Sequence, residues 1–185
     1  MESIDWDVLP ARGGVYCMYD LDDTPVYVGS ASESETRHLK ARLREHFTQQ
    51  NTSVVAHARI DLLDIWYVDY WATREYKIAE KQLIAAQDPV FNRENPTVSS
   101  SPIDVNNPDG TLRICSDAER ETRAKPQNRI RAKMDHIQRM IDSDQVALRS
   151  ISQGHSKRIT AARAAVDYHL SVLESEIENH YAAFE

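Results

Sequence analysis

The chain has 185 residues, 41% of them hydrophobic and 28% charged, with a formal net charge of −7. This composition is typical of a globular protein with one ordinary core and an appendage, and the negative charge argues against a general nucleic-acid coat protein. No apolar run approaches the ~18 to 20 residues of a membrane helix, and the first residues lack a signal peptide. We therefore expect a cytoplasmic protein without a membrane partner. Cys17 and Cys115 lack metal-ligand spacing, which predicts reduced, structural thiols and no zinc site.

Two short segments near the start predict a β-hairpin. Residues 15–20 and 25–29 are rich in valine and tyrosine, and a polar Leu-Asp-Asp-Thr turn separates them. If the connecting loop holds an even number of residues, Tyr16 and Tyr27 face the same side of the sheet. Ordinary β-strand packing of each tyrosine is the alternative.

The next segment, residues 38–47, is predicted to be a helix. Leu39, Leu43 and Phe47 recur every four residues and define its core face. Arg42 and His46 are also four apart, one step off that stripe, so they point together at one neighbouring site. A simple core histidine is the alternative for His46.

A buried strand within residues 58–71 and a helix over residues 73–87 follow. The strand has a high density of β-branched and aromatic residues, and Asp88-Pro89 ends the helix because proline cannot continue it. Glu80 lies in mid-helix among apolar neighbours. A carboxylate there is costly unless it is paired, exposed or bound to a cation. An exposed helix glutamate is the ordinary alternative.

The chain divides into three parts: a first domain over residues 1–93, a linker or irregular wrap over 94–115, and a helical hairpin over 116–185. The middle part is rich in proline and turn-forming residues. Two apolar stripes define the hairpin helices, with a turn at residues 152–155; the stripes are Ile130, Met134, Ile137 and Ile141, and then Ile159, Val166, Leu170, Leu173 and Ile177. A two-helix hairpin buries little alone, so we expect it to pack on the first domain or on a second copy, as a homodimer.

The basic charge is concentrated in the hairpin. Residues 111–165 carry 12 Lys/Arg against 6 Asp/Glu, whereas residues 166–185 carry none against 5. A basic stripe predicts a phosphate-binding surface, and a solvated helix face is the alternative. The candidate DNA contacts are Lys40, Arg129, Arg131, Arg139, Lys157 and Arg158.

One ordered set of motifs spans the first domain. It comprises Leu9-Pro10, Gly14-Val15-Tyr16, Tyr27-Val28-Gly29, the Arg42 and His46 helix, Glu80, Pro89 and Asn92. Over residues 9 to 93 this set resembles the GIY-YIG nuclease domain, a family that includes homing endonucleases, some type II restriction enzymes and the incision domain of the bacterial nucleotide-excision repair nuclease. The resemblance implies an α+β fold with a small antiparallel sheet, here of three strands, flanked by helices and followed by the α-helical hairpin.

The resemblance also implies roles for six catalytic candidates: Tyr16, Tyr27, Arg42, His46, Glu80 and Asn92. Glu80 would be the ligand of one Mg²⁺ or Mn²⁺, and Arg42 would bind the phosphate with a permanently charged donor fork. Tyr16 would be the base or orient the nucleophile. Tyr27 and His46 would bind the phosphate or relay a proton, and Asn92 would brace the site.

Two departures from the family pattern stand out. Ser30 follows the second triplet where many members carry lysine, and Lys40 or Arg37 is the candidate substitute. The connector before the helix is also longer than the family's shortest forms, and its Glu33 and Glu35 are unfavourable beside DNA. Separately, the second half has no cysteine-rich zinc module, which argues against the eukaryotic structure-specific branch. The hypothesis is a divalent-metal-dependent DNA endonuclease that hydrolyses phosphodiester bonds, restriction-like when dimeric. The alternatives are a repair or mobile-element nuclease acting on nicked, branched or single-stranded DNA, and a catalytically inert nucleic-acid-binding or interaction module.

Overall fold

A computed structural model describes residues 4–48, 60–92, 96–149 and 156–182. Its centre is an antiparallel sheet in the order β2-β1-β3-β4, formed by β1 (Gly14–Asp20), β2 (Pro25–Ala31), β3 (Ile65–Ala72) and β4 (Gly110–Arg113). The α+β architecture is as predicted, but the sheet has four strands and the expectation of three was wrong. β4 lies in the segment assigned as a linker. With four residues and only Leu112 buried, it is too short to show an alternating pattern.

The β1-β2 hairpin matches the predicted one and places both tyrosines. Tyr16 pairs with Gly29 and Met18 with Tyr27, so Tyr16 and Tyr27 point to the same face. Asp20 stabilises the turn, because its Oδ1 accepts the backbone N–H groups of Asp22 and Thr24 at 2.9 Å.

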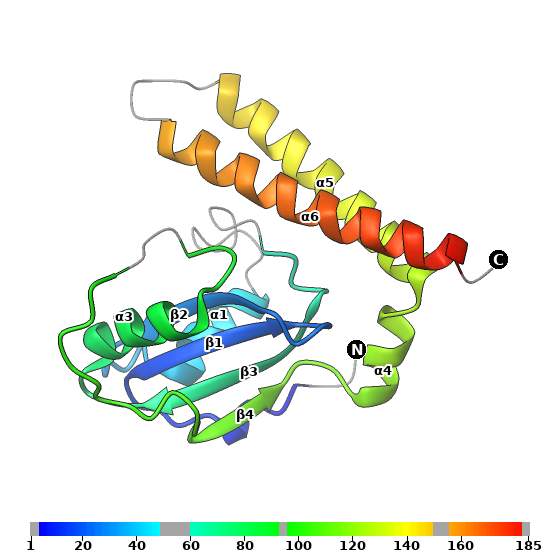
Figure 1. The fold of residues 1–185 in the computed structure, drawn as a ribbon. Coiled ribbons are helices and arrows are strands. Elements are labelled where there is room, and N and C mark those ends of the chain that lie inside the picture. The colour runs from blue at the N-terminus through cyan, green and yellow to red at the C-terminus, as the bar shows by residue number, and fades with distance from the viewer. Residues whose placement is uncertain (1–3, 49–59, 93–95, 150–155, 183–185) are drawn as a thin grey trace.

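Helices cover both faces of this sheet (Figure 1). On one face α1 (Leu39–Thr48) buries Leu39 and Leu43 against the side of β1 that carries Tyr16. On the other face α3 (Tyr76–Gln87) buries Ala79 and Leu83 against Val15, Cys17 and Val28. A short helical turn, η1 (Trp6–Val8), precedes β1. Cys17 and Cys115 are both free and buried, as expected for structural thiols.

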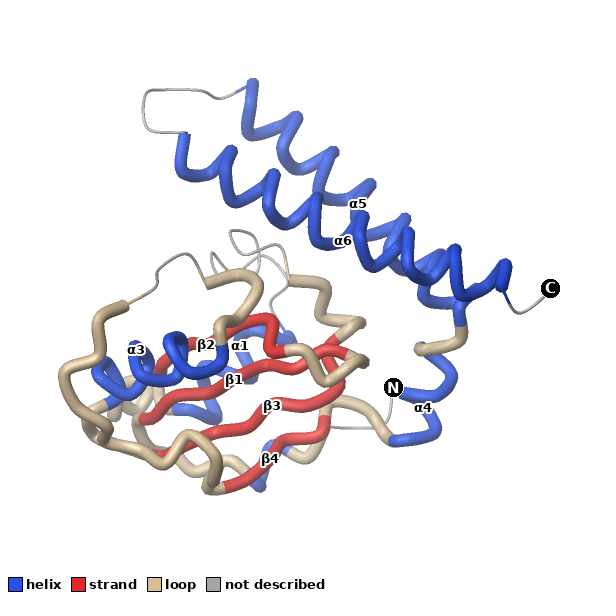
Figure 2. Tube along the Cα trace, in the orientation of Figure 1, coloured by secondary structure: helices blue, strands red, loops and turns tan. Residues whose placement is uncertain are grey.

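The second half is helical, as predicted. α4 (Asp117–Arg123) starts at Ser116, whose side chain accepts the Glu119 N–H. Two long antiparallel helices follow, α5 (Pro126–Arg149) and α6 (Ser156–Ala182), drawn in blue beside the sheet in Figure 2. The predicted turn at 152–155 lies outside the described residues. In the described part of the chain, no helix is both long and apolar enough to cross a membrane.

Candidate active site at the β2 edge

Tyr16 and His46 form a buried hydrogen-bonded pair at the centre of the site. The Tyr16 hydroxyl lies 2.7 Å from His46 Nε2, and the two residues are 1% and 0% exposed. Burial raises the pKa of Tyr16 well above its usual value. Burial, assisted by the Arg42 charge, lowers the pKa of His46 to about 4. Both groups are therefore uncharged at neutral pH.

Tyr27 and Arg42 surround this pair. The ring of Tyr27 lies 6.3 Å from the Tyr16 ring and 6.4 Å from the His46 ring, between centroids. Arg42 lies one helical turn before His46, as its spacing predicts, and its Nη1 contacts Glu45 Oε2 at 2.5 Å. Burial raises the pKa of Tyr27 to about 12, and the Arg42 charge opposes that rise. The Arg42 side chain is 17% exposed, so this cation is partly accessible from solvent.

Glu80 reaches the same phenols from the opposite helical layer. Its Oε2 accepts a hydrogen bond of 2.9 Å from Ser30 on β2. Its negative charge contributes to the raised pKa of both Tyr16 and Tyr27. The carboxylate is thus electrostatically coupled to both phenols, although α3 and α1 lie on different faces of the sheet.

The edge position of β2 explains how the two layers meet. β2 is the outermost strand of the sheet, and both α1 and α3 contact it. Gly29 leaves room for the Tyr16 hydroxyl, because a Cβ at position 29 would lie 2.4 Å from the hydroxyl oxygen. Gly29, the last residue of the Tyr27-Val28-Gly29 motif, is therefore required for close packing and not for a positive φ.

Asn92 binds the free edge of β2. Its Oδ1 accepts the Val28 N–H at 2.7 Å, and its Nδ2 donates to the Val28 carbonyl at 2.9 Å. The amide side chain thereby imitates a neighbouring strand. These two hydrogen bonds place Asn92 beside the strand position next to Gly29.

A divalent cation bound at this edge would have one protein carboxylate, Glu80, and water molecules as most of its ligands. Among the described residues, no group of three or more His, Cys, Asp or Glu side chains could hold a metal ion. Mg²⁺ keeps several waters and commonly takes one or two protein carboxylates, so Glu80 alone is compatible with it. Ser30 hydrogen-bonds this carboxylate.

The predicted DNA contacts of the hairpin require one correction. Arg129 is 4% exposed, and its guanidinium pairs with Asp22, Asp64 and Glu176. Arg129 therefore holds the hairpin against the sheet domain and is not available to DNA. Arg131 and Arg139 are exposed on α5, and Lys40 pairs with Asp7 at 2.6 Å. The side chains of Lys157 and Arg158 lie outside the described residues.

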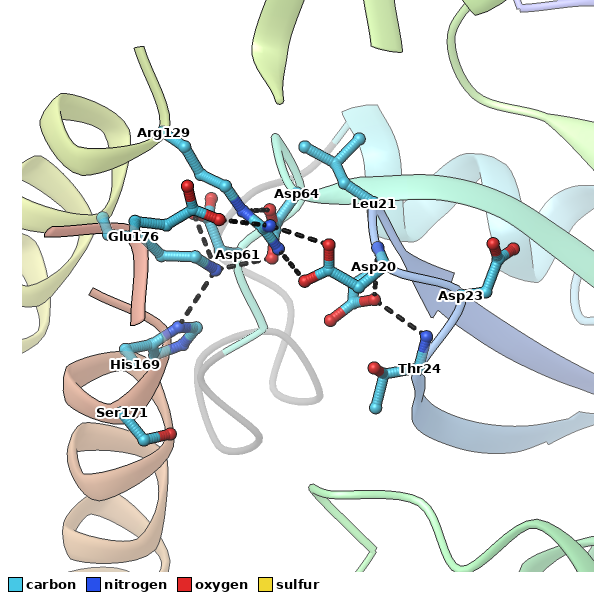
Figure 3. A network of polar contacts seen from close by, with 12 residues as sticks. Asp20, Leu21, Asp23, Thr24, Asp61, Asp64, Arg129, His169, Ser171 and Glu176 are labelled. Carbon is cyan, nitrogen blue, oxygen red and sulfur yellow. Dashed lines mark hydrogen bonds and ion pairs between the residues drawn. The ribbon is translucent and has the colours of Figure 1, made fainter. Parts of the chain in front are cut away.

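Sequence reasoning missed the buried network to which Arg129 belongs (Figure 3). Lys133, 1% exposed, contacts Asp64 at 2.6 Å and Asp61 at 3.8 Å. Tyr168 of α6 donates to Asp20 Oδ2 at 2.6 Å, next to the turn of the β1-β2 hairpin. The acidic partners are separated from the helices by at least 65 positions, and no local pattern could have paired them.

A comparison with known proteins found relatives that match part of the chain. UvrABC system protein C of Legionella pneumophila, in strains Lens and Paris, is 34% identical over 87 residues. Part of this chain therefore resembles part of UvrABC system protein C. The match covers 45% of this chain and 13% of each relative, so the chain corresponds to a small share of those proteins. No family model and no solved structure matches the chain.

The environment of His46 leads to a pH-dependent stability. Its folded-state pKa of about 4 lies below the unfolded value of 6.5, so the unfolded chain binds more protons between these pH values. Stability is therefore complete above pH 6.5 and falls on acidification by about 3 kcal/mol from this residue. Urea unfolding across this range should show a weaker pH dependence for His46→Gln than for the wild type. An NMR titration giving His46 a pKa near 6.5 would contradict the buried pair.

Proposed function

We propose that the chain is a divalent-metal-dependent endonuclease that hydrolyses phosphodiester bonds in DNA. The observation that carries the proposal is the buried Tyr16–His46 pair with Tyr27 and Arg42 beside it, together with the charge of Glu80, which acts on both phenols. Such a set offers a cation for the phosphate, a hard oxygen ligand and hydrogen-bonding groups for the attacking water. The match of 45% of the chain to part of UvrABC system protein C supports it.

Arg42 and Tyr27 are the groups assigned to the scissile phosphate. The guanidinium keeps its charge at any working pH and donates two hydrogen bonds in parallel to phosphate oxygens. Tyr27, with a raised pKa, remains a phenol and donates a further hydrogen bond. Glu80 would hold Mg²⁺ or Mn²⁺, which when bound supplies positive charge for the phosphate and for the attacking water.

Tyr16 is assigned to orienting the attacking water, and His46 to holding the Tyr16 phenol. With the phenol donating to Nε2, the Tyr16 oxygen keeps a lone pair that can accept a hydrogen bond from that water. A phenolate at Tyr16 would be costly, because the residue is buried and the Glu80 charge raises its pKa. His46, with a pKa of about 4, stays neutral and is not the final proton acceptor. Asn92 would keep Gly29 and the edge of β2 in place beside the pair.

A repair-type nuclease acting on nicked, branched or single-stranded DNA is the second candidate. The match to UvrABC system protein C favours it over a restriction-like enzyme. The choice depends on which DNA is cut, and the arrangement of the site does not differ between the two.

Substrate comparison tests the proposal. Supercoiled plasmid, linear duplex, nicked duplex and single-stranded DNA are incubated with the protein in Mg²⁺, in Mn²⁺ and in EDTA. We expect cleavage in the metal buffers and none in EDTA. Discrete fragments from linear duplex would indicate a restriction-like enzyme, and preference for nicked or single-stranded DNA would indicate the repair type. Binding of DNA without cleavage in any metal buffer would refute the enzyme and leave an inert binding module.

A further inference from the structure

The hairpin of α5 and α6 packs with its polar side inward. The buried residues of α5 include Arg129, Lys133 and His136, and those of α6 include His169 and Glu176. They contact one another and the acidic residues of the sheet domain. A hairpin that packs only on its own domain normally buries its apolar stripe. Here Met140 and Ala165 are buried, but Ile130 and Ile137 of the stripe are only half-buried, and other stripe residues are exposed.

On α5 and α6, apolar residues of the stripe lie one position after buried polar residues. Ile130, Met134 and Ile137 directly follow the three buried polar residues of α5, and Leu170 and Ile177 follow those of α6. Met134 is 58% exposed, Leu170 39% and Ile177 37%. Half of the large hydrophobic residues that are exposed in the described part of the chain belong to this hairpin.

The apolar stripes of α5 and α6 lie on the same side of the hairpin. On each helix the stripe is rotated by about 100° about the helix axis from the buried polar residues, because it lies one residue later. Since the two helices are antiparallel, the two rotations run in opposite senses and bring both stripes to one side. Tyr168, which binds Asp20 of the sheet domain, lies one residue before His169 and so on the opposite side. The apolar side therefore faces away from the sheet domain, and its residues Met134, Leu170 and Ile177 are exposed in the described part of the chain.

Charged residues of opposite sign flank the stripe on the two helices. On α5, Arg131 is exposed beside Ile130 and Asp135 beside Met134, and on α6 Glu174 and Glu178 are exposed beside Leu173 and Ile177. Two hairpins related by a twofold axis would place α5 of one copy against α6 of the other, with Arg131 of each copy facing the acidic flank of its partner. The acidic flank of α6 is unfavourable for DNA and for an anionic lipid surface.

We propose that the apolar side of the hairpin binds the same side of a second copy, forming a four-helix bundle that dimerises the protein. The heptad-like spacing of Ile130, Met134 and Ile137 fits the left-handed packing of such bundles. The inference does not rest on the nuclease function: it stands on the exposed stripe and the charge pattern. If the proposed function also holds, the dimer carries two active sites.

Sedimentation equilibrium of the full chain over a wide range of concentrations tests the dimer. The wild type should sediment as a dimer. The double variant Leu170→Glu with Ile177→Glu should weaken the dimer by about a hundredfold or more, since each change places a carboxylate in an apolar seam. Val98→Glu, at a residue also 37% exposed but outside the hairpin, is the matched control and should remain dimeric. A monomeric wild type at every concentration would overturn the proposal.

Charge reversal provides a second measurement that does not alter the stripe. Arg131→Glu should weaken the dimer, and adding Glu174→Arg to the same chain should restore it. Circular dichroism melting checks that each variant is folded. A dimer that is insensitive both to the stripe variant and to Arg131→Glu would show that the copies associate through another surface.

Discussion

Replacing Glu80 with glutamine is expected to reduce DNA cleavage in Mg²⁺ by about a thousandfold or more. The amide keeps the size of the side chain but removes the negative charge that would hold the cation, and loss of one charge-stabilising group in an active site commonly costs that much. The fold should be unchanged, because Gln can still accept the hydrogen bond from Ser30. Single-turnover cleavage rates, with DNA binding measured separately in EDTA, give the effect on chemistry alone.

Glu75→Gln is the matched control for this experiment. Glu75 is an exposed carboxylate at the start of the same helix, and its side chain makes no capping hydrogen bond. Its replacement should leave the cleavage rate unchanged. Equal rates for Glu80→Gln and the wild type would remove the carboxylate from the mechanism.

Replacing Lys133 with methionine is expected to lower the free energy of unfolding by about 3–5 kcal/mol. The ammonium of Lys133 lies between Asp64 and Asp61, and its removal leaves Asp61 without its ammonium partner and Asp64 with Arg129 as its remaining cation. The buried network joins α5 to the sheet domain, so the hairpin should detach before the sheet unfolds. Urea unfolding followed by circular dichroism, with hydrogen exchange to locate the opened segment, measures both effects.

Arg139→Met controls for the loss of a cation from the same helix. Arg139 is exposed, six residues after Lys133, and its replacement should change stability by no more than about 0.5 kcal/mol. The double variant Lys133→Met with Asp61→Asn should recover part of the lost stability, because it removes a carboxylate that has lost its ammonium partner. Equal stability of the Lys133 and Arg139 variants would show that the buried network does not hold the hairpin.

The sequence predicts the hairpin and the first helix well, because their information is local. Alternating residues in β1 and β2 determine that Tyr16 and Tyr27 share a face, and the four-residue spacing places Arg42 beside His46. β4 could not be predicted, because the information that determines it is not local in the sequence. Its four residues carry no period, and it exists because β3 offers a free edge for Gly110 to Arg113.

The apolar stripes of the hairpin were located correctly, but their environment could not be predicted. Sequence periodicity identifies which residues share a helix face, and hydrophobicity suggests that this face is buried. Here the neighbouring face, with Arg129 and Lys133, is the buried one, since acidic partners from distant segments converge there. A helix with basic residues at core spacing is thus a signal of buried ion pairs as well as of a DNA-binding face.

The candidate site contains residues that local spacing places and one residue that only the tertiary structure places. Tyr16, Tyr27, Arg42 and His46 lie on one face of the sheet, and local spacing predicts their proximity. Glu80 belongs to the opposite layer, where it accepts a hydrogen bond from Ser30 of the edge strand β2, next to Gly29. That arrangement depends on the strand order, which no spacing within one element reveals.

A double-mutant cycle with Arg42→Ala and Glu80→Gln tests most directly whether the two helical layers serve one phosphate. Single-turnover cleavage rates in Mg²⁺ are compared for the wild type, the two single variants and the double variant. Side chains that act together on one reacting group are strongly non-additive, so the double variant should be hardly slower than the slower single variant. Effects that multiply fully would mean that Arg42 and Glu80 act independently, and would contradict a shared active site at the β2 edge.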